Sequence, residues 1–295
     1  MQKLGKISVL GGDARMGALA ERLCELGATV YSCGREDCPS GCSRADEPAA
    51  ALEGATALIL PIPSFVEERY VYGMQTPLSA EELFDRVGRS CPVFGARLSP
   101  AIRSRAAQAG VRLIDYAALE EVQLRNAVPT AEGALYLAMQ ALDITLDGAR
   151  AAVIGYGRIG RVLARLLRAL GAEVTVAVRK STDAVRIATE HLTPLQIVYE
   201  GEDSSLLAVC RGYDVIFNTV PCRLFSQRLL AALPRTTLLM ELASAPGGWD
   251  PDDAAAVGAR VIYAPGLPGK YAPRTAGKLL ADSLLPYLQR EVHRV

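Results

Sequence analysis

The amino-acid sequence predicts an α/β protein with two doubly wound, parallel-sheet domains. Length is the first observation, since 295 residues suffice for about two domains of roughly 150 residues each. Short apolar runs that alternate with helical stretches are the second, because this alternation is typical of parallel sheets covered by helices. The third is a strand, a glycine-rich turn and a helix that occur in this order twice, beginning at residues 6 and 150.

The first domain is expected to span residues 1–129. A strand (6–10) leads through the turn GGDARMG (11–17) to a helix that ends at Gly27, and a second strand (29–33) follows. Three further strands and two helices are expected, at 57–61, 92–96 and 111–115 and at about 79–87 and 100–109. The segment NAVP (126–129) is expected to break the pattern, and a helix at 130–142 to lead into the second domain.

The second domain is expected to span residues 130–274. It begins with a complete strand, glycine turn, helix and strand at 150–178. Four more strands are expected, at 195–199, 214–219, 237–242 and 259–264. The last segment, 275–295, carries apolar residues at helical spacing, and we expect this helix to return to the first domain and leave an interdomain cleft.

Composition and charge exclude several functional classes. Lysine plus arginine number 32, as do aspartate plus glutamate, so no net charge favours nucleic acid or an anionic membrane. No apolar stretch approaches the roughly 18 to 20 residues that span a bilayer, and the first apolar run is too short for a secretion signal. We therefore expect a cytoplasmic protein that binds neither nucleic acid nor membrane.

Seven cysteines in such a chain are expected to stay reduced. Cys33, Cys38 and Cys42 would supply three metal ligands, but no fourth ligand is near and the paired spacing of structural zinc sites is missing. We expect a cysteine-bearing loop and no metal, with a metal site as the alternative.

The sequence GYGRIG (155–160) matches the GxGxxG turn of Rossmann-like dinucleotide-binding domains. Gly155 would allow the tight turn, Gly157 the approach of a pyrophosphate, and Gly160 the close packing of the helix on the sheet. The helix N-terminus offers free N–H groups and a partial positive charge to the phosphates. The intervening residues Tyr156, Arg158 and Ile159 are expected beside the cofactor.

The end of the following strand predicts NADP rather than NAD. NAD-binding domains place a carboxylate about 20 residues after the motif, where it bonds the ribose 2′-hydroxyl. This chain has Val178 there, followed by Arg179, Lys180 and Ser181, which suit a 2′-phosphate at the start of a helix. The alternative is that the two cations are merely exposed charges at a strand end.

Loops at the carboxyl ends of the strands are where α/β sheets bind ligands. In the second domain they are expected to surround the nicotinamide and to contribute Asn218, Thr219, Val220, Pro221, Ala243, Ser244, Pro265, Gly266 and Leu267.

In the first domain, the corresponding loop places Asp13 and Arg15 at a helix N-terminus, where a guanidinium beside N–H groups would bind a carboxylate. The alternative is that Arg15 only pairs with Asp13 or another acid. Lys270 and Glu132 are further candidates for catalysis or substrate binding.

Histidine is scarce, and this limits the chemistry. Only His191 and His293 occur, and neither follows a predicted strand directly. Because alcohol oxidation by hydroxyacid dehydrogenases ordinarily needs a histidine to move the hydroxyl proton, a nicotinamide reaction at a C–C or C–N bond fits better.

Several strings taken in order resemble the A subunits of dipicolinate synthase. They are GGDAR (11–15), NAVPTAEG (126–133), GYGRIG with AVRKS (177–181), NTVP (218–221), LASAPGG (242–248) and APGLPGKYAPRTAG (264–277). The glycine- and proline-rich loop before the last helix is also similar to that of methylenetetrahydrofolate dehydrogenases, which share the two-domain plan.

The first resemblance implies NADP-linked oxidation of a dihydrodipicolinate-type ring to pyridine-2,6-dicarboxylate in the mother cell of a sporulating bacterium. It also implies that the partner is a flavoprotein-like B subunit, and we expect a homo-oligomer. Arg15 and the loop at 265–274 would hold the carboxylates of the ring. Two alternatives stay open: another NADP-dependent oxidoreductase, acting on a folate or a hydroxyacid, and a non-catalytic NADP-binding scaffold.

Overall fold

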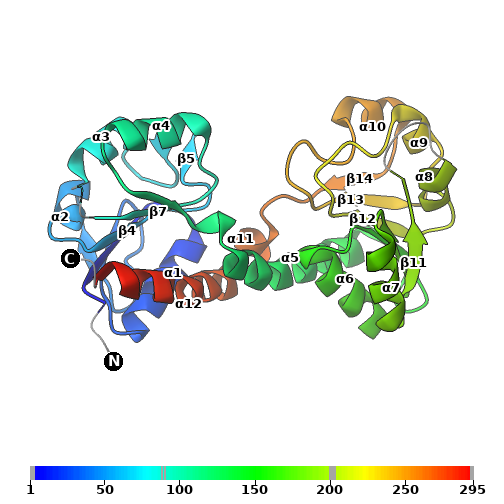
Figure 1. Cartoon of the computed structure of the whole chain (residues 1–295), viewed down its shortest axis with the longest axis horizontal. Helices are drawn as coiled ribbons and strands as arrows, with labels where there is room; N and C mark the ends of the chain where they lie inside the picture. The colour runs from blue at the N-terminus through cyan, green and yellow to red at the C-terminus, as the bar shows by residue number, and fades with distance from the viewer. Residues whose placement is uncertain (1–3, 88, 90, 199–203, 293–295) are drawn as a thin grey trace. The chain divides into compact units, whose positions relative to one another are not determined.

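The computed structural model describes residues 4–87, 89, 91–198 and 204–292, and the chain divides into two compact units. Unit 1 consists of Met1–Asn126 and Pro268–Val295, and unit 2 of Ala127–Leu267. Each unit contains a six-stranded parallel sheet with helices packed against it (Figure 1). The predicted α/β fold with two Rossmann-like sheets is confirmed.

The sheet of unit 1 has the strand order β3–β2–β1–β4–β7–β8. Its strands are β1 (Lys6–Leu10), β2 (Thr29–Cys33), β3 (Ser43–Ala45), β4 (Ala57–Ile59), β7 (Val93–Gly95) and β8 (Leu113–Asp115). The order reverses between β1 and β4, and ligands of doubly wound folds bind at the carboxyl ends of such a strand pair. A small antiparallel hairpin, β5 (Phe65–Val66) and β6 (Tyr70–Val71), follows β4.

The helices of unit 1 bury apolar faces against this sheet. They are α1 (Ala14–Glu25), α2 (Pro48–Leu52), α3 (Ala80–Arg86), α4 (Pro100–Gln108), the 3-10 turn η1 (Tyr116–Ala118) and α12 (Pro273–Val292). Helix α11 (Leu267–Tyr271) begins with the last residue of unit 2 and continues into unit 1.

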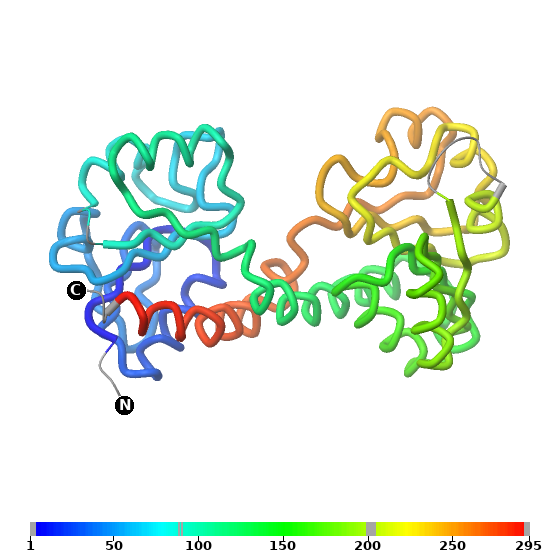
Figure 2. The backbone as a smooth tube through the Cα atoms, in the orientation of Figure 1, coloured from blue at the N-terminus to red at the C-terminus, as the bar shows by residue number. Residues whose placement is uncertain are grey.

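The long helix α12 lies beside α1, as the red and blue segments of Figures 1 and 2 show. Leu280, Leu284 and Leu288 of α12 join the same core as Leu19 and Leu23 of α1. Close approach depends on a glycine, because a Cβ at Gly277 would lie 2.2 Å from the Arg15 carbonyl oxygen. An ion pair of 2.8 Å between Arg22 and Asp282 reinforces the contact.

Unit 2 repeats the topology of unit 1, with the order β11–β10–β9–β12–β13–β14. Its strands are β9 (Arg150–Ile154), β10 (Glu173–Val178), β11 (Thr193–Gln196), β12 (Val215–Asn218), β13 (Leu238–Glu241) and β14 (Val261–Tyr263). Its helices are α6 (Arg158–Ala169), α7 (Ser181–Thr189), α8 (Ser204–Val209), α9 (Gln227–Ala231) and α10 (Pro251–Val257). Here the order reverses between β9 and β12.

The predicted break at 126–129 is wrong. Helix α5 (Glu120–Ala141) continues through Pro129. A proline removes one backbone donor and disfavours the helix, but tertiary packing overrides this preference. The buried face of α5 continues on both sides of the proline, with Ala127, Ala131, Ala134 and Ala138.

Other predicted boundaries shift by a few residues. The contact division falls at Asn126/Ala127 and Leu267/Pro268, so residues 268–274 group with unit 1 rather than with the second domain. The expected strand at 195–199 is β11, which begins and ends earlier, and Tyr199 and His293 lie outside the described residues. Within the described ranges, no helix is long and apolar enough to cross a membrane.

Candidate functional site

The glycine turn of unit 2 has the geometry that its sequence predicts. Gly155 has φ of 95°, and a Cβ there would lie 2.6 Å from Thr219 Oγ1. A Cβ at Gly160 would lie 2.1 Å from the carbonyl oxygen of Gly155, so only glycine lets α6 start this close to β9. Thr219 fixes the turn from the neighbouring strand, because its Oγ1 donates a 2.8 Å hydrogen bond to the Ile154 carbonyl.

Gly157 is the residue of the turn that faces open space. A Cβ added there would meet no heavy atom within 4 Å, and Gly157 caps α6 without any side-chain hydrogen bond. The first N–H groups of α6 are therefore left uncapped by a side chain, with room beside them for a phosphate. These residues fit a dinucleotide.

Two of the intervening residues contribute to packing. The ring of Tyr156 is buried in the core of unit 2, and the guanidinium of Arg161 lies 5.1 Å from its centroid. Ile159 packs partly buried against the same core. Arg158 begins α6.

The structure brings the predicted cationic residues to the end of β10. Val178 is buried as the last residue of the strand, and the exposed Arg179 and Lys180 follow. Ser181 is the first residue of α7, so a helix N-terminus adjoins both cations. Position 178, where NAD-binding domains place a carboxylate, is occupied by valine.

A buried carboxylate joins two of the predicted nicotinamide loops. Glu241, the last residue of β13, is 6% exposed. Its Oε1 accepts hydrogen bonds of 2.9 Å from Asn218 Nδ2 and 2.9 Å from the Ala243 amide, and its Oε2 accepts one from the Gly248 amide. Burial raises the pKa of Glu241, and these donors act against that shift.

Sequence reasoning missed Glu241 and assigned Asn218 to the cofactor. The side chain of Asn218 is fully buried, and it also donates to the Val220 carbonyl and accepts from the Val220 amide. Asn218 therefore positions the loop rather than presenting its amide to a ligand. The one signal in the sequence was a lone carboxylate in the apolar run TLLMEL (237–242).

The other predicted loop residues divide by exposure. Pro221, Ser244, Pro265 and Gly266 are exposed, and Thr219, Val220 and Ala243 are half-buried. Leu267 is 1% exposed and belongs to the core of unit 2.

In unit 1, Arg15 forms an ion pair with Asp13. This pairing was the alternative to carboxylate binding in the sequence analysis. Asp13 caps α1 by accepting from the Arg15 amide, and the Arg15 guanidinium donates 2.6 Å to Asp13 Oδ2 and 2.6 Å to the Ile62 carbonyl. These bonds use Nε and Nη2, and Nη1 of Arg15 donates to no described residue. One edge of a fixed guanidinium is thus left for another acceptor.

Gly269 of α11 lies against Arg15, since a Cβ there would be 2.7 Å from Arg15 Nε. Lys270 of the same helix is exposed. Glu132 is an exposed residue of α5 in unit 2, so the predicted catalytic candidates do not gather in one unit.

The glycine turn of unit 1 is closed to a pyrophosphate. The Gly12 amide donates 2.8 Å to the Tyr72 carbonyl, so a protein segment takes the place of a phosphate there. Arg35 donates from Nη1 to the carbonyls of Gly12 and Asp13, which secures the loop further. In the part of the chain that the structure describes, unit 2 alone therefore combines the motif with an accessible turn.

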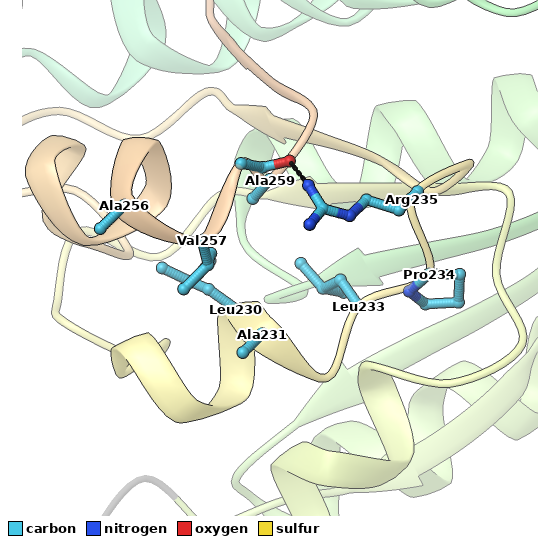
Figure 3. A pocket seen from close by; sticks show the side chains of 9 residues that line it. Leu230, Ala231, Leu233, Pro234, Arg235, Ala256, Val257 and Ala259 are labelled. Atoms are coloured by element: carbon cyan, nitrogen blue, oxygen red, sulfur yellow. Dashed lines mark hydrogen bonds between the residues drawn. The ribbon is translucent and has the colours of Figure 1, made fainter.

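Two other features do not add to the site. A hollow of about 320 Å³ between α9 and α10 is lined by Leu233, Arg235 and Val257 among others (Figure 3). It adjoins the amino ends of β13 and β14, away from the glycine turn. In the cysteine loop, Cys24 Sγ lies 3.5 Å from Cys42 Sγ, and the described His, Cys, Asp and Glu residues form no group of three that would hold a metal.

Two parallel sheets, one of which carries an open GxGxxG turn, define a protein with Rossmann-type, dinucleotide-binding architecture. Comparison with known families agrees: the acetohydroxy acid isomeroreductase NADPH-binding domain matches residues 145–221, and the N-terminal domain of dipicolinate synthase A subunits matches residues 6–117. The dipicolinate synthase A subunit of Bacillus subtilis (strain 168) is 33% identical over 291 residues, which cover 95% of this chain and 94% of that protein. The chain belongs to the family of dipicolinate synthase A subunits.

Solved structures agree with this assignment. The crystal structure of the dipicolinate synthase A subunit from Bacillus halodurans matches with a TM-score of 0.88 and 30% identity, covering 98% of this chain and 99% of that one. The transhydrogenase of Sinorhizobium meliloti matches with a TM-score of 0.71 at 16% identity, covering 97% of this chain and 94% of that one, and so shares the fold. The resemblance found in the sequence is confirmed.

Proposed function

We propose that this protein oxidises a dihydrodipicolinate-type ring to pyridine-2,6-dicarboxylate with NADP, as the A subunit of a dipicolinate synthase. The observation that carries the proposal is the relationship to the A subunits of dipicolinate synthase over 95% of the chain. The open glycine turn of unit 2 supports a dinucleotide, and the Arg15 guanidinium of unit 1 supports a carboxylate.

The chain's own residues fit the binding requirements of this reaction. A bound nicotinamide would supply the hydride acceptor for a ring carbon, and loss of that hydride together with a proton from a neighbouring ring atom would make the ring aromatic. The uncapped N-terminus of α6 would bind the pyrophosphate, and Gly155 and Gly160 keep that terminus next to the sheet. Glu241 and Asn218 would fix the backbone of the loops at 218–221 and 243–248.

NADP is proposed over NAD on electrostatic grounds. Arg179 and Lys180 lie beside the N-terminus of α7, and guanidinium and ammonium groups bind phosphate strongly. A carboxylate at Val178 would have repelled that phosphate.

The dicarboxylate is proposed to bind unit 1 through Arg15, with Lys270 as a second cation on the adjoining α11. Aromatisation lowers the demand for a strong base, and His191 supports no such role because it is an exposed residue between α7 and the start of β11, away from the carboxyl ends of the strands. A flavoprotein-like B subunit is the proposed partner, and a homo-oligomeric state and action in the mother cell are further parts of this proposal.

One assay tests the reaction. The purified chain is incubated with NADP and freshly generated dihydrodipicolinate, both alone and with the B subunit, and NADPH and pyridine absorbance are followed together. Equal amounts of NADPH and pyridine product are expected. Product without NADPH would contradict the role of NADP, and no product under either condition would favour the scaffold alternative.

The Arg15→Ala variant tests the substrate site. Loss of a hydrogen bond to a charged group costs about 1.5–3 kcal/mol, so KM for the ring should rise roughly 10- to 100-fold while the Kd for NADP stays constant. Arg44→Ala is the matched control, because Arg44 is an exposed arginine of unit 1 that pairs with Asp46 at the surface. A loss of NADP binding in Arg15→Ala would contradict the assignment.

A further inference from the structure

Arg97, two residues after the end of β7, has a backbone conformation that residues other than glycine rarely adopt. Its φ is 56°, in the left-handed region that favours glycine. Its neighbours Ala96 and Leu98 are buried at 0% and 7% exposure, yet Arg97 itself is exposed. Strained residues of this kind persist where the surroundings fix them, and they concentrate at binding sites.

The surroundings of Arg97 do fix it. Ser64, in the loop after β4, accepts a 2.7 Å hydrogen bond from the Ala96 amide and donates its own amide to the Ala96 carbonyl at 3.1 Å. On the other side, Arg103 Nε donates 3.3 Å to the Leu98 carbonyl. The backbone on both sides of Arg97 is therefore tied to neighbouring elements.

The side chain of Arg97, in contrast to its backbone, is not held by neighbouring described residues. Among the described residues it forms no hydrogen bond or ion pair, whereas Arg15, Arg22, Arg35, Arg103 and Arg112 all pair with carboxylates. A strained backbone that presents an uncommitted guanidinium has no evident structural purpose.

Arg97 and Arg15 lie at the same edge of the same sheet. Arg15 follows β1 and Arg97 follows β7, and β4 lies between these strands. The loop after β4 contacts both, since Arg15 bonds the Ile62 carbonyl and Ser64 bonds Ala96. Two strand spacings of about 4.8 Å separate the strand ends by about 10 Å.

We propose that Arg97 is a second carboxylate-binding residue, which acts with Arg15 to hold a small planar dicarboxylate on unit 1. A six-membered ring with a carboxylate on either side of its nitrogen presents two anions in one plane, and two long arginine side chains from strand ends this far apart can each pair with one of them. The inference rests on the proposed function and assigns its specificity: two arginines select a dicarboxylate over a monocarboxylate.

The Arg97→Gly variant separates binding from backbone strain. Glycine adopts this φ freely, so the melting temperature should be unchanged or higher. Calorimetric binding of pyridine-2,6-dicarboxylate should weaken at least tenfold, and its preference over pyridine-2-carboxylate should disappear. Arg97→Asn, which also tolerates the left-handed region, should behave alike.

Glu67→Gly is the matched control, since Glu67 is an exposed residue of unit 1 with φ of 53° in the β5–β6 hairpin. It should gain stability without a change in binding. Wild-type binding of the dicarboxylate by Arg97→Gly and Arg97→Asn would overturn the inference and leave the proposed reaction intact. Failure of the wild-type protein to bind the dicarboxylate at all would overturn both.

Discussion

Replacing Glu241 by glutamine tests the contact that joins the two cofactor loops. The ionised carboxylate accepts from Asn218, Ala243 and Gly248, using both oxygens. Glutamine keeps one oxygen and replaces the other by an NH2 group, so at least one buried donor then faces another donor. An unsatisfied buried group costs about 1–3 kcal/mol, and the lost charge raises the total toward the upper value.

The melting temperature of unit 2 should therefore fall by about 5–10 °C, because a loss of about 1 kcal/mol lowers the melting temperature by about 2–4 °C in domains of this size. The assay is thermal unfolding of the variant and the wild-type protein by circular dichroism at the same pH, together with titration of NADP. Because Asn218 and Ala243 lie in the loops proposed to surround the nicotinamide, the Kd for NADP should rise as well.

The control is Glu173→Gln, an exposed position of β10 in the same unit. Surface changes of this kind stay within about 0.5 kcal/mol. If the Glu241→Gln and Glu173→Gln variants have the same melting temperature, the Glu241 carboxylate does not organise these loops, and the prediction is refuted.

Three further predictions concern the cofactor and the thiols. The double variant Arg179→Ala with Lys180→Ala should lose most of its preference for NADP over NAD with little change in NAD affinity, as measured by the two dissociation constants; equal affinities in the wild-type protein would contradict the proposal. Burial raises the pKa of Cys91 to about 11 and that of Cys210 to about 12. At pH 8, iodoacetamide should therefore label the exposed Cys38 first and Cys91 and Cys210 only after denaturation, which mass spectrometry would measure. Since both pKa values lie above the unfolded value of about 8.5, the free energy of unfolding should fall as pH rises from there toward 11.

Local patterns were sufficient for most strands and for the glycine turn of unit 2, but they did not predict the short strands β3, β5 and β6. Alternating apolar runs locate β1, β9 and β10, and Gly155, Gly157 and Gly160 serve backbone geometry that depends on few distant residues. Pro129 shows where local reasoning fails, because its helix is maintained by alanines that pack on distant strands.

The carboxylates and arginines of the sites were harder to predict. The hydrogen bonds of Glu241 come from two loops that meet only in the folded sheet, and the φ of Arg97 depends on Ser64, more than 30 residues earlier in the chain. The closure of the first glycine turn by Tyr72 likewise has no local signature. Residue spacing identifies a glycine-turn motif, but whether a phosphate can reach that turn depends on residues distant in the sequence, such as Tyr72.

The packing of α12 on α1 has a consequence for synthesis on the ribosome. Unit 1 is interrupted by the whole of unit 2, and its core lacks Leu280, Leu284 and Leu288 until the last helix is made. At about 5–20 residues per second, roughly 7 to 30 seconds pass between the emergence of residue 126 and that of residue 268. Unit 2 is continuous and can complete its sheet during this interval. The order of synthesis therefore favours folding of the dinucleotide-binding unit before the unit that precedes it in the sequence.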